Sequence, residues 1–211
     1  MGLRAEKKDR LRRQLLANAI QLFKERGFEE VTIDDIIRPL EISPATFFNY
    51  FPSKDVLLQQ AAEDAVVAYR EMLENEIRRD APTAQKMHRL LEAMGRGLQA
   101  DKRFYRTLFT RSVLHLGNVK AHRVLSDLSA AVMRQGQERG DIRPEYDPHE
   151  LAHIFIGVYY AIIMRWLHGD GTESLVERLH RGVTIFLSGV ACPAIEMAGR
   201  RPDRRRAGSG S

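Results

Sequence analysis

Apolar residues recur three and four positions apart along nearly the whole chain, which is the spacing of helices that bury one face. The first such stripe consists of Leu15, Leu16, Ala19, Leu22 and Phe23. It ends at Gly27, a residue type that commonly takes the left-handed position after a helix. Because no alternating run bounded by turn residues marks a strand, the pattern predicts an all-α fold of about nine helices.

Two short helices are expected after Gly27. Thr32 and Asp35 have the spacing of a capping box at the start of the second helix. Ser43 and Pro44 are typical of the N-cap and the first position of a third helix, because proline has no N–H group to leave unpaired there. Both helices should therefore begin at positions that local chemistry defines.

The remaining helices are longer, and turn-forming residues separate them. Ser53 should cap a fourth helix that runs from residue 54 to about residue 80. The later helices are expected near 83–100, 102–115, 119–139, 148–168 and 173–191.

Residues 32–51 have the layout of a helix-turn-helix motif, with two short helices joined by a tight turn. A corner of an ordinary helical bundle has the same spacing, so the side chains must decide between the two. Phe47 and Phe51 lie one turn apart and should face inward. The positions left on the open face and at the helix start are Pro44, Ala45, Thr46, Phe48, Asn49 and Tyr50.

This short, uncharged, hydrogen-bonding face suits the edges of DNA bases. Asn49 can pair with N6 and N7 of adenine, and Thr46 can bond a base or contact a thymine methyl group. Tyr50 can donate to a phosphate. Lys54 stands at the start of the next helix, where unpaired backbone N–H groups already attract a phosphate oxygen. The sequence thus predicts a DNA-reading helix with a phosphate contact beside it.

From residue 15 to residue 58 the chain resembles the tetracycline-repressor (TetR) family of bacterial regulators. The matching residues are Leu15-Leu16, Ala19, Leu22-Phe23, Gly27-Phe28, Thr32, Asp35-Ile36, Ile42-Ser43, Thr46-Phe47, Tyr50-Phe51, Ser53-Lys54 and Leu57-Leu58. The resemblance implies a sequence-specific, DNA-binding transcriptional regulator, specifically a repressor that a small-molecule effector releases from a palindromic operator. The positions that it places on DNA are Thr32, Pro44, Ala45, Thr46, Phe48, Asn49, Tyr50 and Lys54.

Three residues depart from the family pattern. The turn usually holds a small residue followed by glycine, whereas this chain has Pro39 and Glu41 there. Pro39 should shorten the second helix, and Glu41 costs about 1–2 kcal/mol if the turn needs a left-handed residue. Phe48 replaces a usual tyrosine and loses a phosphate hydrogen bond, but it can pack on a sugar or a thymine methyl group.

Two apolar helices near the carboxyl end predict an interface between subunits. In members of the family the corresponding helices pair with their copies across a two-fold axis, as a reader of palindromic half-sites requires. The predicted homodimer interface consists of Leu151, Phe155, Val158, Ile162, Leu179, Val183 and Phe186. The alternative is that both stripes fill the core of a single subunit.

The middle helices carry the residues expected around an effector. Methionine and aromatic side chains at helical spacing can form either core or pocket, and the predicted pocket residues are Met94, Leu98, Phe104, Tyr105, Phe109 and Val113. They favour a small apolar or aromatic effector. Arg103, Arg106 and Arg111 lie nearby and leave an anionic head group possible, although they could equally be solvated.

The domain organisation follows from these assignments. We expect a helix-turn-helix DNA-binding domain at 1–53, a helical effector-binding and dimerisation domain at 54–197, and a disordered basic tail at 198–211. The net charge of +5 permits an anionic partner such as double-stranded DNA. No signal peptide and no apolar run of about 18 residues are recognisable, so the expected location is the cytoplasm, with no membrane contact. The single cysteine, Cys192, cannot form an internal disulfide.

A rival hypothesis comes from His149-Glu150-Leu151-Ala152-His153, a match to the zinc-peptidase signature in which two histidines bind the metal. Glu173 lies downstream as a candidate third ligand. However, Asp147 and Pro148 are typical of a helix start, and this position alone explains Glu150 in the first turn. We therefore expect no enzyme, no cofactor and no metal site. A protein-binding module on the same fold is a further alternative, and such a module would be expected to lose the polar reading face.

Overall fold

The computed structural model of this chain describes residues 3–111, 119–170 and 173–190. Within these ranges the regular elements are helices, so the predicted all-α fold is confirmed. They are α1 (Leu3–Arg26), α2 (Ile33–Ile37), the 3-10 helix η1 (Arg38–Leu40), α3 (Pro44–Phe48), α4 (Lys54–Arg78), α5 (Thr83–Ala100), α6 (Lys102–Arg111), α7 (Val119–Arg139), α8 (Pro148–His168) and α9 (Leu175–Val190). The predicted tail at 198–211 and Cys192 lie outside the described residues.

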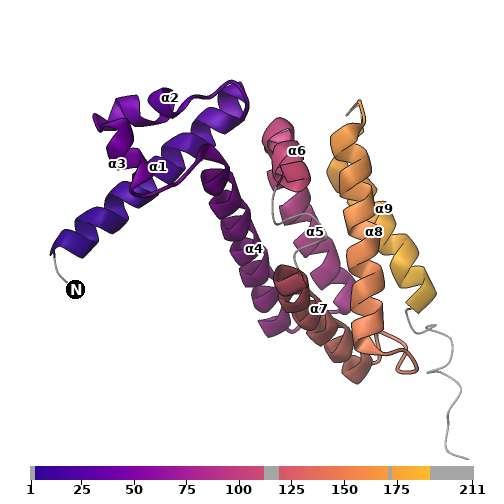
Figure 1. Ribbon diagram of the computed structural model, residues 1–211. Helices are drawn as coiled ribbons and strands as arrows, with labels where there is room; N and C mark the ends of the chain where they lie inside the picture. Colours follow the sequence, from indigo (N-terminus) through magenta and orange to yellow (C-terminus); the bar gives the residue numbers. More distant parts are fainter. Residues whose placement is uncertain (1–2, 112–118, 171–172, 191–211) are drawn as a thin grey trace, which may run out of the picture.

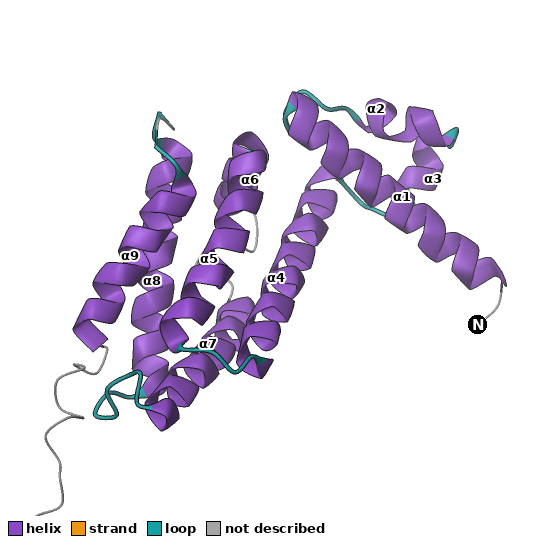
Figure 2. Ribbon diagram, turned by 180° about the vertical axis from the view of Figure 1, so that it is seen from behind, coloured by secondary structure: helices purple, strands orange, loops and turns teal. Residues whose placement is uncertain are grey.

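The helices form two units of unequal size, and α4 belongs to both (Figure 1). α1, α2 and α3 make the small unit around the beginning of α4. From there α4 runs into a larger bundle that it shares with α5 to α9. The opposite view gives the same division, with α1 to α3 on one side of the start of α4 and the bundle on the other (Figure 2).

A small apolar core fixes the position of α3 in the first unit. Leu15, Phe23, Ile36, Phe47 and Phe51 are each fully buried there. Phe47 and Phe51 face inward as predicted, with ring centroids 6.1 Å apart. Burial of such side chains contributes about 1.5–3 kcal/mol each, which is enough to hold a helix of five residues that could not exist alone.

The core of the larger unit lies around α8. The helices that pack most extensively against α8 are α7, α9 and α6. By length and composition α8 is apolar enough to cross a membrane, but 44% of its most apolar window is buried inside the bundle. Its apolar character is therefore that of a central core helix.

The predicted dimer interface has to be corrected, because most of it lies inside one subunit. Leu151, Phe155, Leu179, Val183 and Phe186 are at most 8% exposed and belong to the core of the larger unit. Val158 and Ile162 are partly buried beside Gly182. The stripes were apolar on more than one face, and periodicity alone does not tell which face turns towards the subunit's own core.

One short helix, α6, joins the two cores. Phe104 and Leu108 on one side of α6 are buried with the core of the first unit. Phe109 on its other side belongs to the core of the larger unit, and Tyr105 packs against both cores. A displacement of α6 would therefore disturb both units at once.

Candidate nucleic-acid interface and ligand pocket

α3 begins at a cap that the sequence predicted. The Ser43 side chain accepts a hydrogen bond from the Thr46 backbone N–H at 3.2 Å, and Pro44 occupies the first helical turn. The Thr46 hydroxyl also lies 3.0 Å from the Ser43 hydroxyl. The helix ends after five residues, with Asn49 as its C-cap.

The predicted reading residues of α3 lie together on the outer side of the first unit. Pro44, Ala45 and Asn49 are exposed, and Thr46 and Tyr50 are partly buried. The ring of Phe48 is 49% exposed, and it meets the buried ring of Phe47 edge-on at 5.5 Å. An exposed phenylalanine on a soluble surface costs solvation free energy unless another molecule covers it, so Phe48 is suited to contact a sugar or a base methyl group.

The turn before α3 holds Glu41 in a backbone conformation that is unusual for a residue other than glycine. Glu41 has φ of 51°, and among the described residues other than glycine it alone has a positive φ. Pro39 sits in η1, which follows α2 directly, so α2 ends after five residues. Both expectations for the departures from the family pattern are met. The turn tolerates a glutamate in the left-handed region at a cost of about 1–2 kcal/mol.

α2 starts with the predicted capping box. The Thr32 backbone N–H donates to a carboxylate oxygen of Asp35 at 3.0 Å, and the Thr32 hydroxyl accepts from the Asp35 N–H at 3.1 Å. Arg26 reaches the same carboxylate at 3.2 Å. The bonds from Thr32, assisted by Arg26, hold the pKa of Asp35 well below its usual range. The side chain of Thr32 remains exposed beside these groups.

Lys54 differs from the expectation for a phosphate contact. Its ammonium group donates to the backbone carbonyls of Phe28 at 2.6 Å and Val31 at 2.9 Å, and it lies 4.4 Å from the centre of the Phe28 ring. It therefore fastens α4 to the loop after α1. Ser53 occupies the N-cap of α4 as predicted, although its side chain makes no capping hydrogen bond.

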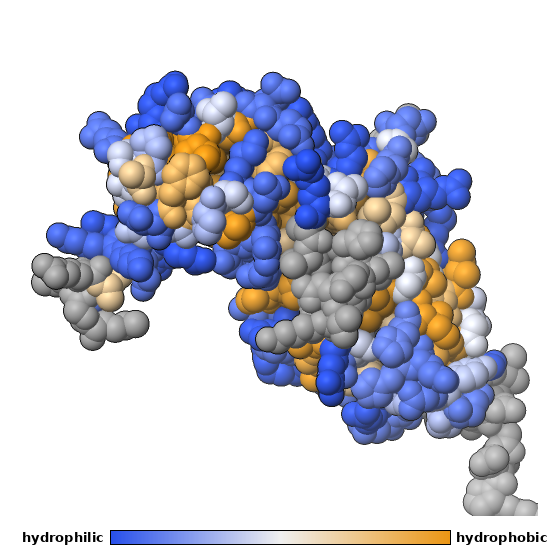
Figure 3. Space-filling model, viewed as in Figure 1, coloured by the Kyte–Doolittle hydropathy of each residue, from blue (hydrophilic) through white to orange (hydrophobic). Residues whose placement is uncertain are grey.

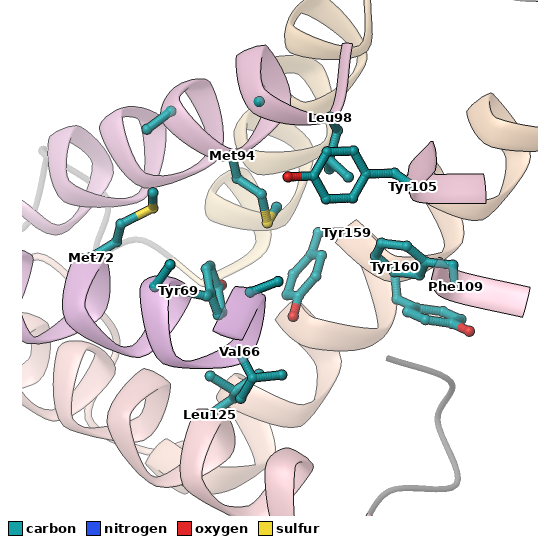
Figure 4. Close-up of a pocket in the computed structure, with 14 residues that line it drawn as sticks. Val66, Tyr69, Met72, Met94, Leu98, Tyr105, Phe109, Leu125, Tyr159 and Tyr160 are labelled. Carbon is teal, nitrogen blue, oxygen red and sulfur yellow. The ribbon is translucent and has the colours of Figure 1, made fainter. Parts of the chain in front are cut away.

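A cavity of about 180 Å³ opens among five helices of the larger unit. α4 contributes the longest part of its wall, and α5, α6, α7 and α8 complete it (Figure 4). The lining residues are Ala65, Val66, Ala68, Tyr69, Met72, Ala93, Met94, Gly97, Leu98, Tyr105, Phe109, Leu125, Tyr159 and Tyr160. A concave, mostly apolar wall of this kind is typical of small-molecule sites.

Four of the six residues predicted for the pocket line this cavity, namely Met94, Leu98, Tyr105 and Phe109. Phe104 does not, because it is buried in the core of the first unit. Val113 lies outside the described residues. Sequence reasoning missed the wall that α4, α7 and α8 provide, and nothing local in those helices distinguishes a wall residue from a core residue.

Tyrosines give the cavity its polar groups. Burial raises the pKa of Tyr69 well above its usual value, and the neighbouring Tyr159 hydroxyl raises it further. Burial also raises the pKa of Tyr159, to about 12, and that of Tyr105. The hydroxyl of Tyr105 points towards Met94 across the cavity (Figure 4). These phenols are neutral at physiological pH and can exchange hydrogen bonds without charge.

The three arginines that left an anionic head group possible do not line the cavity. Arg111 pairs with Glu29 at 3.3 Å and with Asp55 at 3.6 Å, on the side of the first unit. The guanidinium group of Arg103 packs against Gly27, and Arg106 is exposed. The described wall thus offers no arginine to an anion.

The two histidines of the zinc-peptidase signature lie at the start of α8, apart from the proposed third ligand. Asp147 caps the helix by accepting from the His149 and Glu150 backbone N–H groups. The backbone carbonyl of Glu173 accepts a hydrogen bond from the indole N–H of Trp166. Trp166 lies about 20 Å from His153 along α8. Glu173 therefore cannot complete that site. Within the described ranges, no three His, Cys, Asp or Glu side chains are grouped to hold a metal.

Comparison with known proteins agrees with the helix-turn-helix assignment. The model of the family "Bacterial regulatory proteins, tetR family" matches residues 15–61. The HTH-type transcriptional regulator LuxR of Vibrio harveyi is 25% identical over 159 residues, which cover 73% of this chain and 78% of that protein.

Solved structures extend the similarity to the whole fold. RolR in complex with resorcinol has 26% identity and a TM-score of 0.63, covering 93% of this chain and 97% of that one. FadR of Thermus thermophilus in complex with lauroyl-CoA has 23% identity and a TM-score of 0.65, covering 84% and 94%. The motif, the fold and these relatives together show that residues 15–61 carry the DNA-binding domain of the tetR family of bacterial regulatory proteins, and that the chain is a DNA-binding transcriptional regulator.

Proposed function

We propose that this regulator is a repressor whose homodimer binds a near-palindromic operator through α3 and leaves it when a small molecule fills the cavity. Such a protein acts where the DNA is, in the cytoplasm. The polar face of α3 supports the first part of the proposal. Thr46 and Asn49 present hydrogen-bonding groups beside the exposed ring of Phe48, and no acidic residue of α3 would repel the DNA.

The observation that carries the coupling is the position of α6 between the two cores. Tyr105 and Phe109 line the cavity, while Phe104 and Leu108 are buried with the core that supports α3. A ligand that favours a different placement of α6 would therefore shift the reading unit relative to the bundle. Coupling of this kind can be no larger than the difference between the ligand's affinities for the two states.

α4 provides a second connection between the cavity and the reading unit, which consists of α1, α2 and α3. It is fastened at its start by Lys54 to the loop after α1, and two turns or more further on its side chains line the cavity. The ion pair between Lys24 of α1 and Asp101 beside α6, at 2.7 Å, joins the units a third time. Two of the helices that line the cavity, α4 and α6, thus also contact the reading unit.

For the homodimer we propose the outer faces of α8 and α9 in place of the buried stripes. Ile154 is 56% exposed and Ile185 is 73% exposed, although both lie in the middle parts of apolar helices. Apolar residues also come to the surface on the side of the molecule that α8 and α9 form (Figure 3). A two-fold axis would bury this face against its copy, as in an isologous interface.

The ligands of structural relatives indicate the range of sizes and charges to consider for the effector. RolR was solved with resorcinol, a single ring, and FadR of Thermus thermophilus with lauroyl-CoA, a long chain attached to a highly charged group. The cavity described above, with its small volume and its uncharged wall, supports an effector nearer to the first of these.

Selection of bound duplexes from a random DNA pool tests the proposed function. The expected result is enrichment of a near-palindrome with half-sites about 34–36 Å apart or somewhat more, because each subunit of the dimer presents one α3. Enrichment of a single asymmetric site would contradict the dimer. Recovery of the pool without enrichment would contradict sequence-specific binding.

A further inference from the structure

The chemistry of the cavity wall restricts what the cavity can bind. None of the described lining residues carries a formal charge; they are aliphatic residues, two methionines, one phenylalanine and four tyrosines. The ionised groups that act on Tyr105 are Lys24 and Asp101, and these two neutralise each other in an ion pair at 2.7 Å. An anion or a cation that entered would lose its hydration without gaining a partner, which costs far more than apolar contact returns.

Within this apolar wall, Tyr69 holds a polar atom that the protein does not satisfy. The residue is 8% exposed, and no described group accepts from or donates to its hydroxyl in normal hydrogen-bonding geometry. The ring of Tyr159 lies 6.2 Å from the ring of Tyr69, and its hydroxyl is close enough to raise the pKa of Tyr69, but the geometry leaves the Tyr69 hydroxyl without a hydrogen-bond partner. Buried polar atoms are nearly always paired, so an unpaired one in a cavity wall points to a partner from outside the chain.

The volume limits the size of that partner. An apolar cavity of about 150 Å³ accommodates one benzene ring. The cavity here, at about 180 Å³, therefore has room for a single ring with a short substituent. The rings of Tyr69, Tyr105 and Tyr159 in its wall are suited to edge-to-face contact with such a ring.

We propose that the cavity binds a small, neutral, single-ring compound with a hydroxyl or carbonyl group, and that the Tyr69 hydroxyl is the specificity-determining hydrogen-bond partner. The inference rests on the proposed role of the cavity as the effector site. It adds to that role the exclusion of charged ligands, and it names the residue that distinguishes a phenol from the corresponding hydrocarbon.

Three probes of nearly equal shape test the inference on the full chain at pH 7: ethylbenzene, 4-ethylphenol and 4-ethylbenzoate. Isothermal titration calorimetry should show that 4-ethylphenol binds about tenfold more tightly than ethylbenzene, as one additional hydrogen bond allows. 4-Ethylbenzoate should bind at least a hundredfold more weakly than the phenol. Equal affinity for the benzoate and the phenol would overturn the exclusion of charge, and failure of all three probes to bind would overturn the assignment of size and polarity.

The variant Tyr69→Phe keeps the ring and removes only the hydroxyl. It should fold with an unchanged melting temperature, bind ethylbenzene as before, and lose the preference for the phenol. Tyr146→Phe is the matched control, because Tyr146 is exposed and remote from the cavity wall, and it should keep the tenfold preference. A Tyr69→Phe protein that still prefers the phenol would overturn the role of Tyr69.

Gly97→Leu locates the probes. A Cβ atom added at Gly97 meets nothing within 4 Å, so there is open space beside this wall residue, and a leucine there should reduce the space for a ring. It should weaken binding of both neutral probes; unchanged binding would place them elsewhere and contradict the inference.

Operator binding, measured in parallel, separates the inference from the proposed function. If 4-ethylphenol binds through Tyr69 but leaves operator affinity unchanged, the release mechanism is wrong and the ligand class stands. If a charged compound that competes with the probes releases the operator, the ligand class is wrong and the release mechanism stands.

Discussion

Thr32 and Asp35 cap the start of α2 and also connect it to α1. Their reciprocal bonds satisfy backbone N–H groups that the helix cannot pair, and Arg26 of α1 joins the same carboxylate. Because α2 is only five residues long, this cap has a large influence on whether the helix forms. The position of α2, and with it the orientation of α3, depends on a carboxylate that must remain ionised.

The capping box predicts a specific pH dependence of stability. The pKa of Asp35 is lower in the folded state than in the unfolded chain, so the unfolded state binds more protons in acid. The stabilisation that the ionised Asp35 carboxylate gives the fold is complete above pH about 4, and it is lost as the pH falls towards the folded-state pKa. Urea unfolding at several pH values should show the wild type more stable than Asp35→Asn at pH 7, with a gap that narrows below pH about 4.

The neighbouring carboxylate provides the control for this experiment. Asp34 lies in the same first turn, is exposed, and takes no part in the box. Asp34→Asn should therefore leave the pH dependence of stability close to that of the wild type. A gap between wild type and Asp35→Asn that stays constant down to pH 2.5 would contradict the account of the cap.

Lys54 yields a second prediction at this scale, because its ammonium group is used inside the protein. Lys54→Met removes charged hydrogen bonds to Phe28 and Val31 and should lower the free energy of unfolding by about 1–2 kcal/mol. Lys7→Met, at an exposed position of α1, should have no measurable effect on stability. Chemical denaturation followed by circular dichroism measures both. If Lys54→Met is as stable as the wild type and only reduces the salt dependence of DNA binding, then Lys54 is a phosphate contact alone.

At the scale of elements, α6 is the feature that links the two activities. Arg111 at its end contacts Glu29 after α1 and Asp55 in the first turn of α4, and its guanidinium group lies 5.1 Å from the centre of the Phe28 ring. One side chain thus connects α6 to both segments that position the reading unit. Its ion pairs are partly exposed, so each contributes at most about 1 kcal/mol.

Replacement of Arg111 should weaken the coupling without weakening either binding site. Arg111→Met should bind the effector normally in the absence of DNA, while the effector-induced loss of operator affinity should fall by about two- to fivefold. Arg106→Met is the control on the same helix, since Arg106 is exposed and lies away from these contacts. Fluorescence anisotropy with labelled operator, with and without effector, measures the effect. An unchanged effector response in Arg111→Met would exclude this contact from the coupling.

The elements also indicate which features could be predicted from sequence. Ser43 and Pro44 start α3, and Gly27 with φ of 91° follows α1, because caps depend on a few neighbouring residues. The orientation of α8 could not be predicted in the same way. Ile154 is 56% exposed and the adjacent Phe155 is 2% exposed, although both are large and apolar. Only the packing of α7 and α9 against the helix distinguishes them.

The two candidate sites also differ in how well the sequence predicts them. The residues of the reading face follow one another within a short segment, so composition and spacing sufficed to predict where they gather. The cavity depends on helices far apart in the chain: Tyr69 belongs to α4 and Tyr159 to α8. The contacts of Lys54 with the loop at residues 28–31 are non-local as well, and no pattern around residue 54 indicates them.

For the whole molecule, the exposed face of α8 and α9 predicts how two copies associate. Ile154→Glu with Ile185→Glu should give a folded monomer, because both side chains are exposed in the single subunit. Light scattering measures the mass, and circular dichroism verifies the fold. Phe155→Glu should instead unfold the protein, since a buried phenylalanine would become an unpaired charge. A double variant that remains dimeric would place the interface on another face.

The central claim is that α3 reads bases, and the binding of Asn49→Ala to two kinds of DNA tests it most directly. The measurement compares wild type and variant on the selected operator and on random duplex at one fixed salt concentration. The account predicts a loss of about 1–3 kcal/mol on the operator and much less on random DNA, with a smaller difference for Thr46→Ala. Equal losses on both DNAs would make Asn49 a backbone contact, and unchanged binding in both variants would show that α3 is not the reading helix.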